Sequence, residues 1–187
     1  MIHAAIFASG EGTNAENLFR YFQNDPRIKI KLVITNRDDA GIVARAEAFR
    51  KNVQIISKQA LEGYTDQIIE FLKTEKIDLI ILAGFLLKIP EAMVKAFPGK
   101  IVNIHPSLLP KYGGKGMYGH KVHEAVIQNH ETESGITIHF VNEEYDKGEI
   151  ILQARCTVES HDTPESLSQK VRSLEHEYFP KAIEKLL

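Results

Sequence analysis

The chain has 187 residues, of which 43% are hydrophobic and 26% charged, and its net charge is −2. These values are typical of one soluble globular domain, and they exclude a disordered, collagen-like or coiled-coil chain. A single cysteine, Cys156, fits a reducing compartment. The longest apolar run is too short to span a membrane, and the first residues lack the features of a signal peptide. We therefore expect a cytoplasmic protein with no membrane contact.

Basic and acidic residues are interspersed, tryptophan is absent, and no stripe of Lys and Arg appears. This pattern argues against nucleic acid as a partner and favours small-molecule substrates.

Apolar runs of strand length alternate with helical patterns through the first two-thirds of the chain. The expected strands cover residues 2–8, 28–35, 53–57, 77–83 and 101–104, and the expected helices cover 13–23, 41–51 and 64–74, with a short helix after Pro90. This alternation predicts an α/β fold: an open, twisted, mostly parallel sheet of Rossmann-like type with helices on both faces. We expect residues 1–187 to form a single domain.

The last third follows a different pattern. Residues 135–141 and 149–158 alternate in polarity around an acidic loop, which predicts an antiparallel pair of strands added to the sheet. A final helix is expected over residues 163–187, with Asp162 or Thr163 as its N-cap and Pro164 in its first turn.

The first candidate site is the turn between the first strand and the first helix, residues 9–14. Gly10 and Gly12 permit close backbone approach, and Thr13 and Asn14 add donors, so the turn suits a phosphate at a helix N-terminus. It lacks the Lys-Ser/Thr of a P-loop and the third glycine of the dinucleotide fingerprint. An ordinary glycine-containing turn fits the pattern equally well.

The second candidate site follows the fifth strand, where ligands bind in open α/β sheets. Asn103 and His105 fall on the same side of that strand and pair an amide donor with a proton carrier. Asp146, in the acidic loop, is either a turn former or a carboxylate that orients His105. His120 and His123 lack the spacing of a helical metal motif, so we expect no metal.

Residues 103–112, Asn-Ile-His-Pro-Ser-Leu-Leu-Pro-Lys-Tyr, resemble the signature of enzymes that use formyltetrahydrofolate. Further matching segments are the loop with residues 13–14 and residues 82–85, 135–141, 146–148, 151–153 and 175–176. From residue 2 to about residue 185 the chain is similar to the phosphoribosylglycinamide formyltransferase family.

The resemblance implies transfer of a formyl group from 10-formyltetrahydrofolate, as co-substrate, to the amine of a glycinamide ribonucleotide in purine biosynthesis. In the catalytic roles it implies, Asn103 polarises the formyl oxygen, His105 moves protons, and Asp146 raises the pKa of His105. The substrate-binding residues it implies are Gly12, Thr13, Asn14 and Glu175. The folate-binding residues it implies are Leu86, Leu87, Lys88, Ile89, Asn103, Asn142, Glu143, Glu144, Tyr145 and Asp146.

The chain departs from the family where arginines often contact folate, since Leu61 and Leu87 stand there, and Gly113-Gly114 replaces a Pro-Gly pair. The alternative function within the same fold is that of a sugar-nucleotide formyltransferase or a formyltetrahydrofolate hydrolase. The alternative from another functional class is a non-catalytic nucleotide-binding module, which leaves Asn103, His105 and Asp146 unexplained. We expect a monomer or a weak homodimer.

Overall fold

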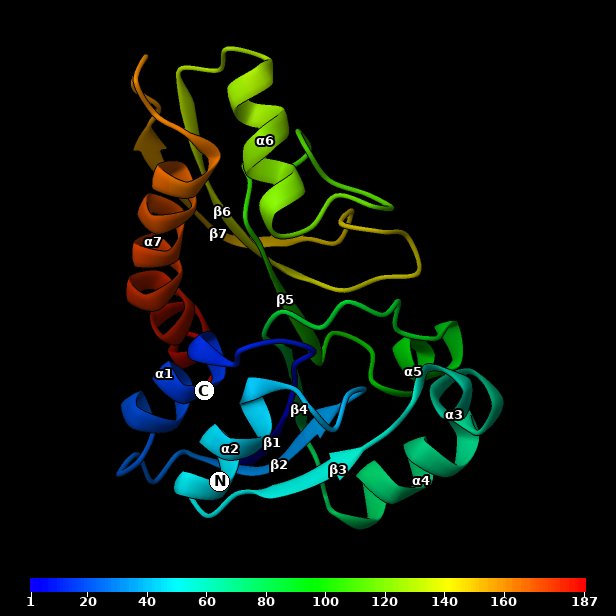
Figure 1. Cartoon of the computed structure of the whole chain (residues 1–187). Helices are drawn as coiled ribbons and strands as arrows, with labels where there is room; N and C mark the ends of the chain where they lie inside the picture. The colour runs from blue at the N-terminus through cyan, green and yellow to red at the C-terminus, as the bar shows by residue number, and fades with distance from the viewer. The chain divides into compact units, whose positions relative to one another are not determined.

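The computed structural model describes residues 1–187 without a gap. Its strands are β1 (Ile2–Phe7), β2 (Ile28–Thr35), β3 (Asn52–Ile55), β4 (Leu79–Leu82), β5 (Ile101–His105), β6 (Glu133–Phe140) and β7 (Ile150–Thr157). Its helices are α1 (Thr13–Tyr21), α2 (Gly41–Ala48), α3 (Lys58–Gly63), α4 (Thr65–Thr74), α5 (Glu91–Ala96), α6 (His120–Gln128) and α7 (Pro164–Glu184). Figure 1 traces them in chain order.

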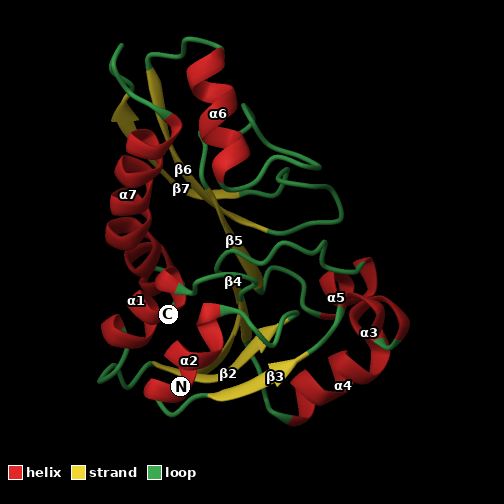
Figure 2. Cartoon of the chain, in the orientation of Figure 1, coloured by secondary structure: helices red, strands yellow, loops and turns green.

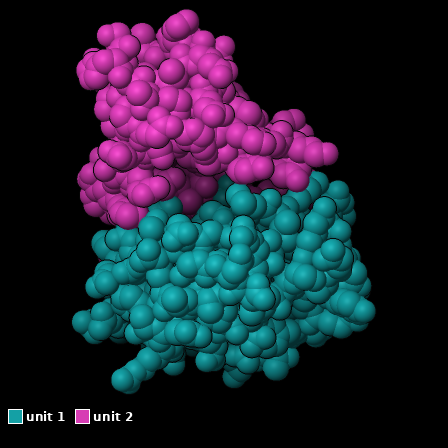
Figure 3. Space-filling view, in the orientation of Figure 1, with its two compact units in different colours: residues 1–103, 187 teal, residues 104–186 magenta.

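The chain forms two compact units (Figure 3): residues 1–103 with Leu187, and residues 104–186. The boundary falls within β5. The expectation of a single domain stays a prediction.

The first unit is built on parallel strands in the order β3-β2-β1-β4-β5. Every residue of β4 is buried, as expected for a central parallel strand that is covered on both faces. The edge strand β3 is largely exposed. The helices of this unit form two groups (Figure 2). In one group α1 packs against α2, and in the other α4 packs against α3 and α5.

The second unit contains the antiparallel pair β6–β7, with Thr137 opposite Gln153, and α7 packs on both strands. Thr163 caps α7 as predicted. Its hydroxyl accepts from Ser166 N at 3.2 Å, and Ser166 Oγ accepts from Thr163 N at 3.0 Å. This reciprocal capping box fixes where the helix begins.

The hydrogen-bonded strand order is β3-β2-β1-β4-β5-β6-β7. This confirms the predicted mostly parallel sheet with an antiparallel C-terminal addition. The short helix α3 was not predicted; Ser57 caps it by accepting from Ala60 N at 3.1 Å. No helix combines the length and the apolar character that crossing a membrane requires.

Candidate active site

The phosphate-loop candidate connects β1 to α1. Gly12 is the N-cap of α1 and has φ 75° and ψ 22°, the left-handed conformation that glycine adopts without strain. The helical hydrogen bonds begin with Glu16 N donating to Gly12 O at 2.9 Å. Thr13 and Asn14 precede that bond in the first turn of α1. The backbone N–H groups of a first helical turn form the positive end of the helix dipole, which is an arrangement suited to an anion.

Ser9 ties this loop to the carboxyl ends of two neighbouring strands. Its amide donates to Gly84 O at 3.0 Å, and its hydroxyl donates to Asn36 Oδ1 at 2.5 Å. The same hydroxyl accepts from Leu86 N at 2.9 Å. The loop and the start of the predicted folate segment are therefore fixed to each other within the first unit.

The predicted folate segment that follows β4 is only partly accessible. Leu86 is 53% exposed and Lys88 is also exposed, whereas Leu87 is half-buried and Ile89 is 5% exposed. Ile89 therefore belongs to the core, and Leu86 is the apolar side chain most available to a flat ring. Leu61, where the family often has arginine, is likewise a core residue at 1% exposure.

Asn103 and His105 lie two residues apart at the carboxyl end of β5. Strand alternation directs both side chains to the same side. Asn103 is half-buried, and His105 is 4% exposed. The segment thus combines a partly accessible amide with a desolvated imidazole.

Within the second unit, the carboxylate of Asp146 lies between two imidazoles. His105 Nδ1 is 3.7 Å from Asp146 Oδ2, and His139 Nε2 is 3.6 Å from Asp146 Oδ1. Gly114 N also donates to Asp146 Oδ2 at 2.8 Å. The structure therefore brings His105 and Asp146 together, and it adds His139 and Gly114, which the sequence analysis did not identify.

Backbone carbonyls settle which ring nitrogen of each histidine carries hydrogen. His105 Nε2 lies 2.8 Å from Tyr112 O, and His139 Nδ1 lies 2.8 Å from Phe140 O. Because a carbonyl only accepts, these nitrogens are the N–H donors. Nδ1 of His105 is consequently the nitrogen that gains or loses a proton, and it faces Asp146.

The pKa of His105 corrects the expectation from sequence. Burial lowers it below the ordinary value of 6.5, and this effect outweighs the negative charge of Asp146, which raises it. For Asp146, burial alone would raise the pKa, but His139, the charge of His105 and the Gly114 amide together bring it below 3.8. The pair therefore consists of an anionic carboxylate and an imidazole that favours its neutral form.

The rest of the acidic loop faces solvent. Glu143, Glu144 and Tyr145 are exposed, and Glu144 pairs with Lys147, while Asn142 Oδ1 accepts from Glu144 N at 3.0 Å. Of the acidic side chains in this loop, that of Asp146 points inward, toward His105. The backbone of Asp146 has φ 53°. Asp tolerates this left-handed conformation better than most residues do. Glu175, predicted to contact ribose, lies half-buried on α7.

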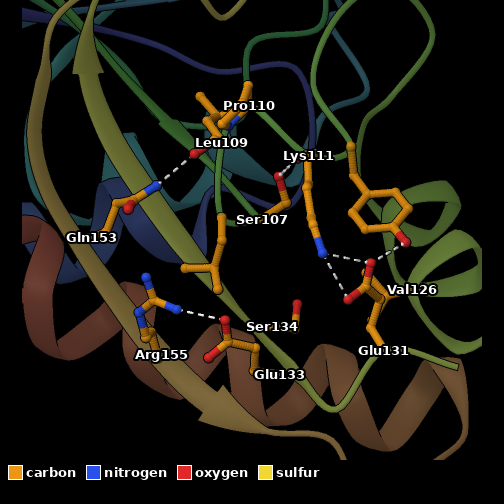
Figure 4. A pocket seen from close by; sticks show the side chains of 12 residues that line it. Ser107, Leu109, Pro110, Lys111, Val126, Glu131, Glu133, Ser134, Gln153 and Arg155 are labelled. Carbon is orange, nitrogen blue, oxygen red and sulfur yellow. Dashed lines mark hydrogen bonds and ion pairs between the residues drawn. The ribbon is translucent and has the colours of Figure 1, made fainter. Parts of the chain in front are cut away.

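A cavity of about 200 Å³ lies beside residues 107–112, between β6, β7 and the turn after α6 (Figure 4). Its charges are already paired: Lys111 with Glu131 at 3.0 Å, and Arg155 with Glu133 at 2.5 Å. Tyr112 OH also donates to Glu131, at 3.0 Å. These contacts hold residues 111–112 in place, and the Tyr112 carbonyl in turn orients His105. The residues around the cavity therefore position the site, and the cavity itself is not the reaction centre.

No group of three or more His, Cys, Asp or Glu side chains is arranged to hold a metal ion. His120, exposed on α6, lies 3.3 Å from Glu124, whereas His123 on the same helix is buried. The two histidines that the sequence singled out do not form a metal site.

Residues 2–183 match the formyl transferase family. The chain is 39% identical over 185 residues to the chloroplastic phosphoribosylglycinamide formyltransferase of Arabidopsis thaliana, spanning 96% of this chain but only 63% of that protein. It is 35% identical to the phosphoribosylglycinamide formyltransferase of Bacillus subtilis, spanning 98% of this chain and 93% of that protein. The crystal structure of the phosphoribosylglycinamide formyltransferase from Bacillus halodurans superposes with a TM-score of 0.90 at 35% identity, over 99% of this chain and 95% of that one.

Proposed function

The chain belongs to the formyl transferase family, and we propose that it transfers the formyl group of 10-formyltetrahydrofolate to the primary amine of 5′-phosphoribosylglycinamide. The observation that carries the proposal is the buried contact between His105 and Asp146, two residues beyond Asn103 on β5. The names of the relatives that span most of this chain agree with it.

The reaction needs addition to the formyl carbon, expulsion of N10 and transfer of one proton. The amine nitrogen forms a bond to the formyl carbon, and the C=O π electrons move to oxygen. That electron pair then re-forms the C=O bond as the carbon–N10 bond of the folate breaks, and a proton passes from the new ammonium to N10. Asn103 donates its amide N–H to the developing oxyanion, which lowers the barrier because charge appears there in the transition state.

His105 moves the proton. Its Nδ1 lacks hydrogen in the neutral form, because Tyr112 O holds the hydrogen on Nε2. With its pKa lowered by burial, the imidazole is neutral near pH 7, so it takes the proton from the ammonium and then gives it to N10. Asp146 stabilises the transient imidazolium.

The substrate contacts are proposed from the resemblance and are supported by local geometry. Residues Gly12, Thr13 and Asn14 bind the phosphate through backbone amides, and Glu175 contacts the ribose. The segments 86–89 and 142–146 bind the folate, with Leu86 as the exposed apolar contact.

The partners are therefore small molecules. We propose a monomer or a weak homodimer without nucleic-acid or membrane partners, acting in the cytoplasm. Gel filtration with light scattering tests the oligomeric state.

The activity is tested with purified protein and 10-formyl-5,8-dideazafolate, by recording the absorbance change with and without glycinamide ribonucleotide. We expect turnover only when the ribonucleotide is present, and loss of turnover in His105→Asn. Turnover without acceptor identifies a hydrolase and overturns the proposal. Turnover with a sugar-nucleotide amine, and none with glycinamide ribonucleotide, identifies a sugar-nucleotide formyltransferase and overturns the proposed acceptor.

A further inference from the structure

Two consecutive carbonyls of the phosphate loop are held by α2. Ile42 N donates to Gly10 O at 3.1 Å, and Arg45 Nε donates to Glu11 O at 2.7 Å. Both donors belong to α2, which packs against α1 within the first unit (Figure 1).

These contacts fix the direction of the loop's amides. The Leu109–Pro110 bond is the only cis peptide of the chain, so the peptides after Gly10 and Glu11 are trans. In a planar trans peptide the C=O and the following N–H point in opposite directions. With both carbonyls directed at α2, the N–H groups of Glu11 and Gly12 are directed away from it, and they join the amides of Thr13 and Asn14 in the first turn of α1.

Arg45 also controls charge beside the loop. It forms an ion pair with Glu16 in the first turn of α1, and Glu16 pairs with Arg20 at 2.7 Å on its other side. An anionic Glu16 close to a phosphate site would repel the ligand. The two arginines offset that charge, but only Arg45 also bonds the loop backbone.

We propose that Arg45 is a positioning residue for the ribonucleotide phosphate: it orients the Gly12 amide by anchoring the Glu11 carbonyl, without touching the ligand itself. This inference rests on the proposed function, because it requires that residues 10–14 bind the phosphate. The arginine is 34 residues from Glu11 in sequence, so no motif in the loop reveals it.

The first test compares Arg45→Met with Arg20→Met. Methionine keeps the apolar stem and removes the donors. Both variants remove one partner of Glu16, and Arg20→Met also removes the contact of Arg20 with the Phe49 ring, but only Arg45→Met frees the Glu11 carbonyl. We expect Arg45→Met to raise the KM for the ribonucleotide by about tenfold, the size of a lost charged hydrogen bond.

The KM for the folate and kcat should stay within about twofold of wild type in both variants, because the loop does not take part in the proton transfer. Arg45→Lys should recover part of the loss, since a compact ammonium keeps the charge but lacks the planar fork that reaches both acceptors. Equal effects of Arg45→Met and Arg20→Met on the ribonucleotide KM overturn the inference, and so does a loss confined to kcat.

A second measurement needs no turnover. Inorganic phosphate is titrated into ¹⁵N-labelled protein while the amide resonances of residues 11–14 are followed. In wild type we expect these resonances to shift on binding, and in Arg45→Lys and Arg45→Met the Gly12 shift should shrink and the apparent Kd should rise.

The two failures are distinguishable. If phosphate shifts none of these amides in wild type, the phosphate subsite of the proposed function is wrong. If the loop binds phosphate equally well in wild type and both Arg45 variants, the subsite stands and the role of Arg45 is wrong.

Discussion

His105 Nδ1 lies 3.7 Å from Asp146 Oδ2, yet the imidazole is a weaker base than a free histidine. Burial disfavours the charged ring more than the neighbouring carboxylate favours it. His105 therefore enters the proposed reaction as a base. The charge of Asp146 limits how far the pKa of His105 falls, and in the proposed reaction this keeps the imidazolium accessible during the proton transfer.

Replacing Asp146 by asparagine should lower the pKa of His105 further. Asn keeps the shape and an acceptor for Gly114 N but removes the charge that raises that pKa. We expect kcat to fall by roughly 10²–10⁴, the range for lost acid–base assistance. In wild type we expect the acid limb of the kcat/KM profile to lie below the ordinary pKa of histidine. In Asp146→Asn it should move to still lower pH. NMR titration of the His105 imidazole measures the shift directly.

Glu149→Gln is the matched control for that experiment. Glu149 lies three residues further along the chain, but it is exposed and outside the proposed folate segment. The variant should leave kcat and the His105 titration unchanged. An identical His105 titration in folded wild type and Asp146→Asn would show that Asp146 does not act through charge.

Asn103→Ala tests the oxyanion role. Removing one preorganised donor typically costs on the order of 10²–10³ in kcat. The KM for the ribonucleotide should change little, because the contact forms in the transition state. Asn52→Ala, which removes an exposed amide from the edge strand β3, is the control and should keep full kcat. A loss of less than about tenfold in Asn103→Ala removes this residue from the role.

Most of the sheet was predictable because each strand carries its own signal. The buried run of β4 and the alternating burial of β2 follow directly from their apolar patterns. Helix α3 was missed because it has only six residues and one buried apolar side chain, Leu61. Its only local sign was Ser57, a capping residue.

The site was less predictable, because its contacts join distant segments. Asn103, His105 and Asp146 were predicted from the resemblance and local chemistry, and the structure brings His105 and Asp146 together. His139 reaches Asp146 only because β6 leads into the acidic loop and returns as β7. In the sequence, its only signs were its place on an expected strand and within the matching segment 135–141. The direction of the pKa shift of His105 depends on burial, which a sequence does not report.

Gly12 should be intolerant of any side chain. An added Cβ would lie 2.6 Å from Ile42 Cδ1 and 2.8 Å from its Cα, at φ 75°. We expect Gly12→Ala to lower the free energy of unfolding by about 1–3 kcal/mol, from backbone strain and from displacement of α2. Gly10→Ala is the control in the same loop, because nothing lies within 4 Å of its Cβ position. Equal urea midpoints for Gly12→Ala and Gly10→Ala would contradict the close packing of Gly12 against Ile42. Because Gly12 variants also alter stability, their ribonucleotide KM is a poorer test of the phosphate site than phosphate titration.

His123 should make the protein sensitive to mild acid. This α6 side chain is 4% exposed, its Nδ1 has no hydrogen-bond partner, and burial lowers its pKa to about 4, with His120, Arg172 and His105 adding positive charge nearby. The unfolded chain binds a proton near pH 6.5, whereas the folded chain does not until about pH 4. The contribution of His123 to the free energy of unfolding is therefore fully present above pH 6.5. It falls between pH 6.5 and pH 4, by up to about 3 kcal/mol.

Urea unfolding at pH 7.5, 6.5, 5.5 and 4.5 measures this slope. In His123→Gln, which cannot titrate, the free energy of unfolding should depend less steeply on pH over that window, although buried His105 keeps part of the slope because its pKa is shifted in the same direction. His161→Gln removes an exposed histidine and should reproduce the wild-type slope. A His123→Gln slope equal to wild type would show that this imidazole is not held neutral by burial, and the acid sensitivity would then have to come from other groups.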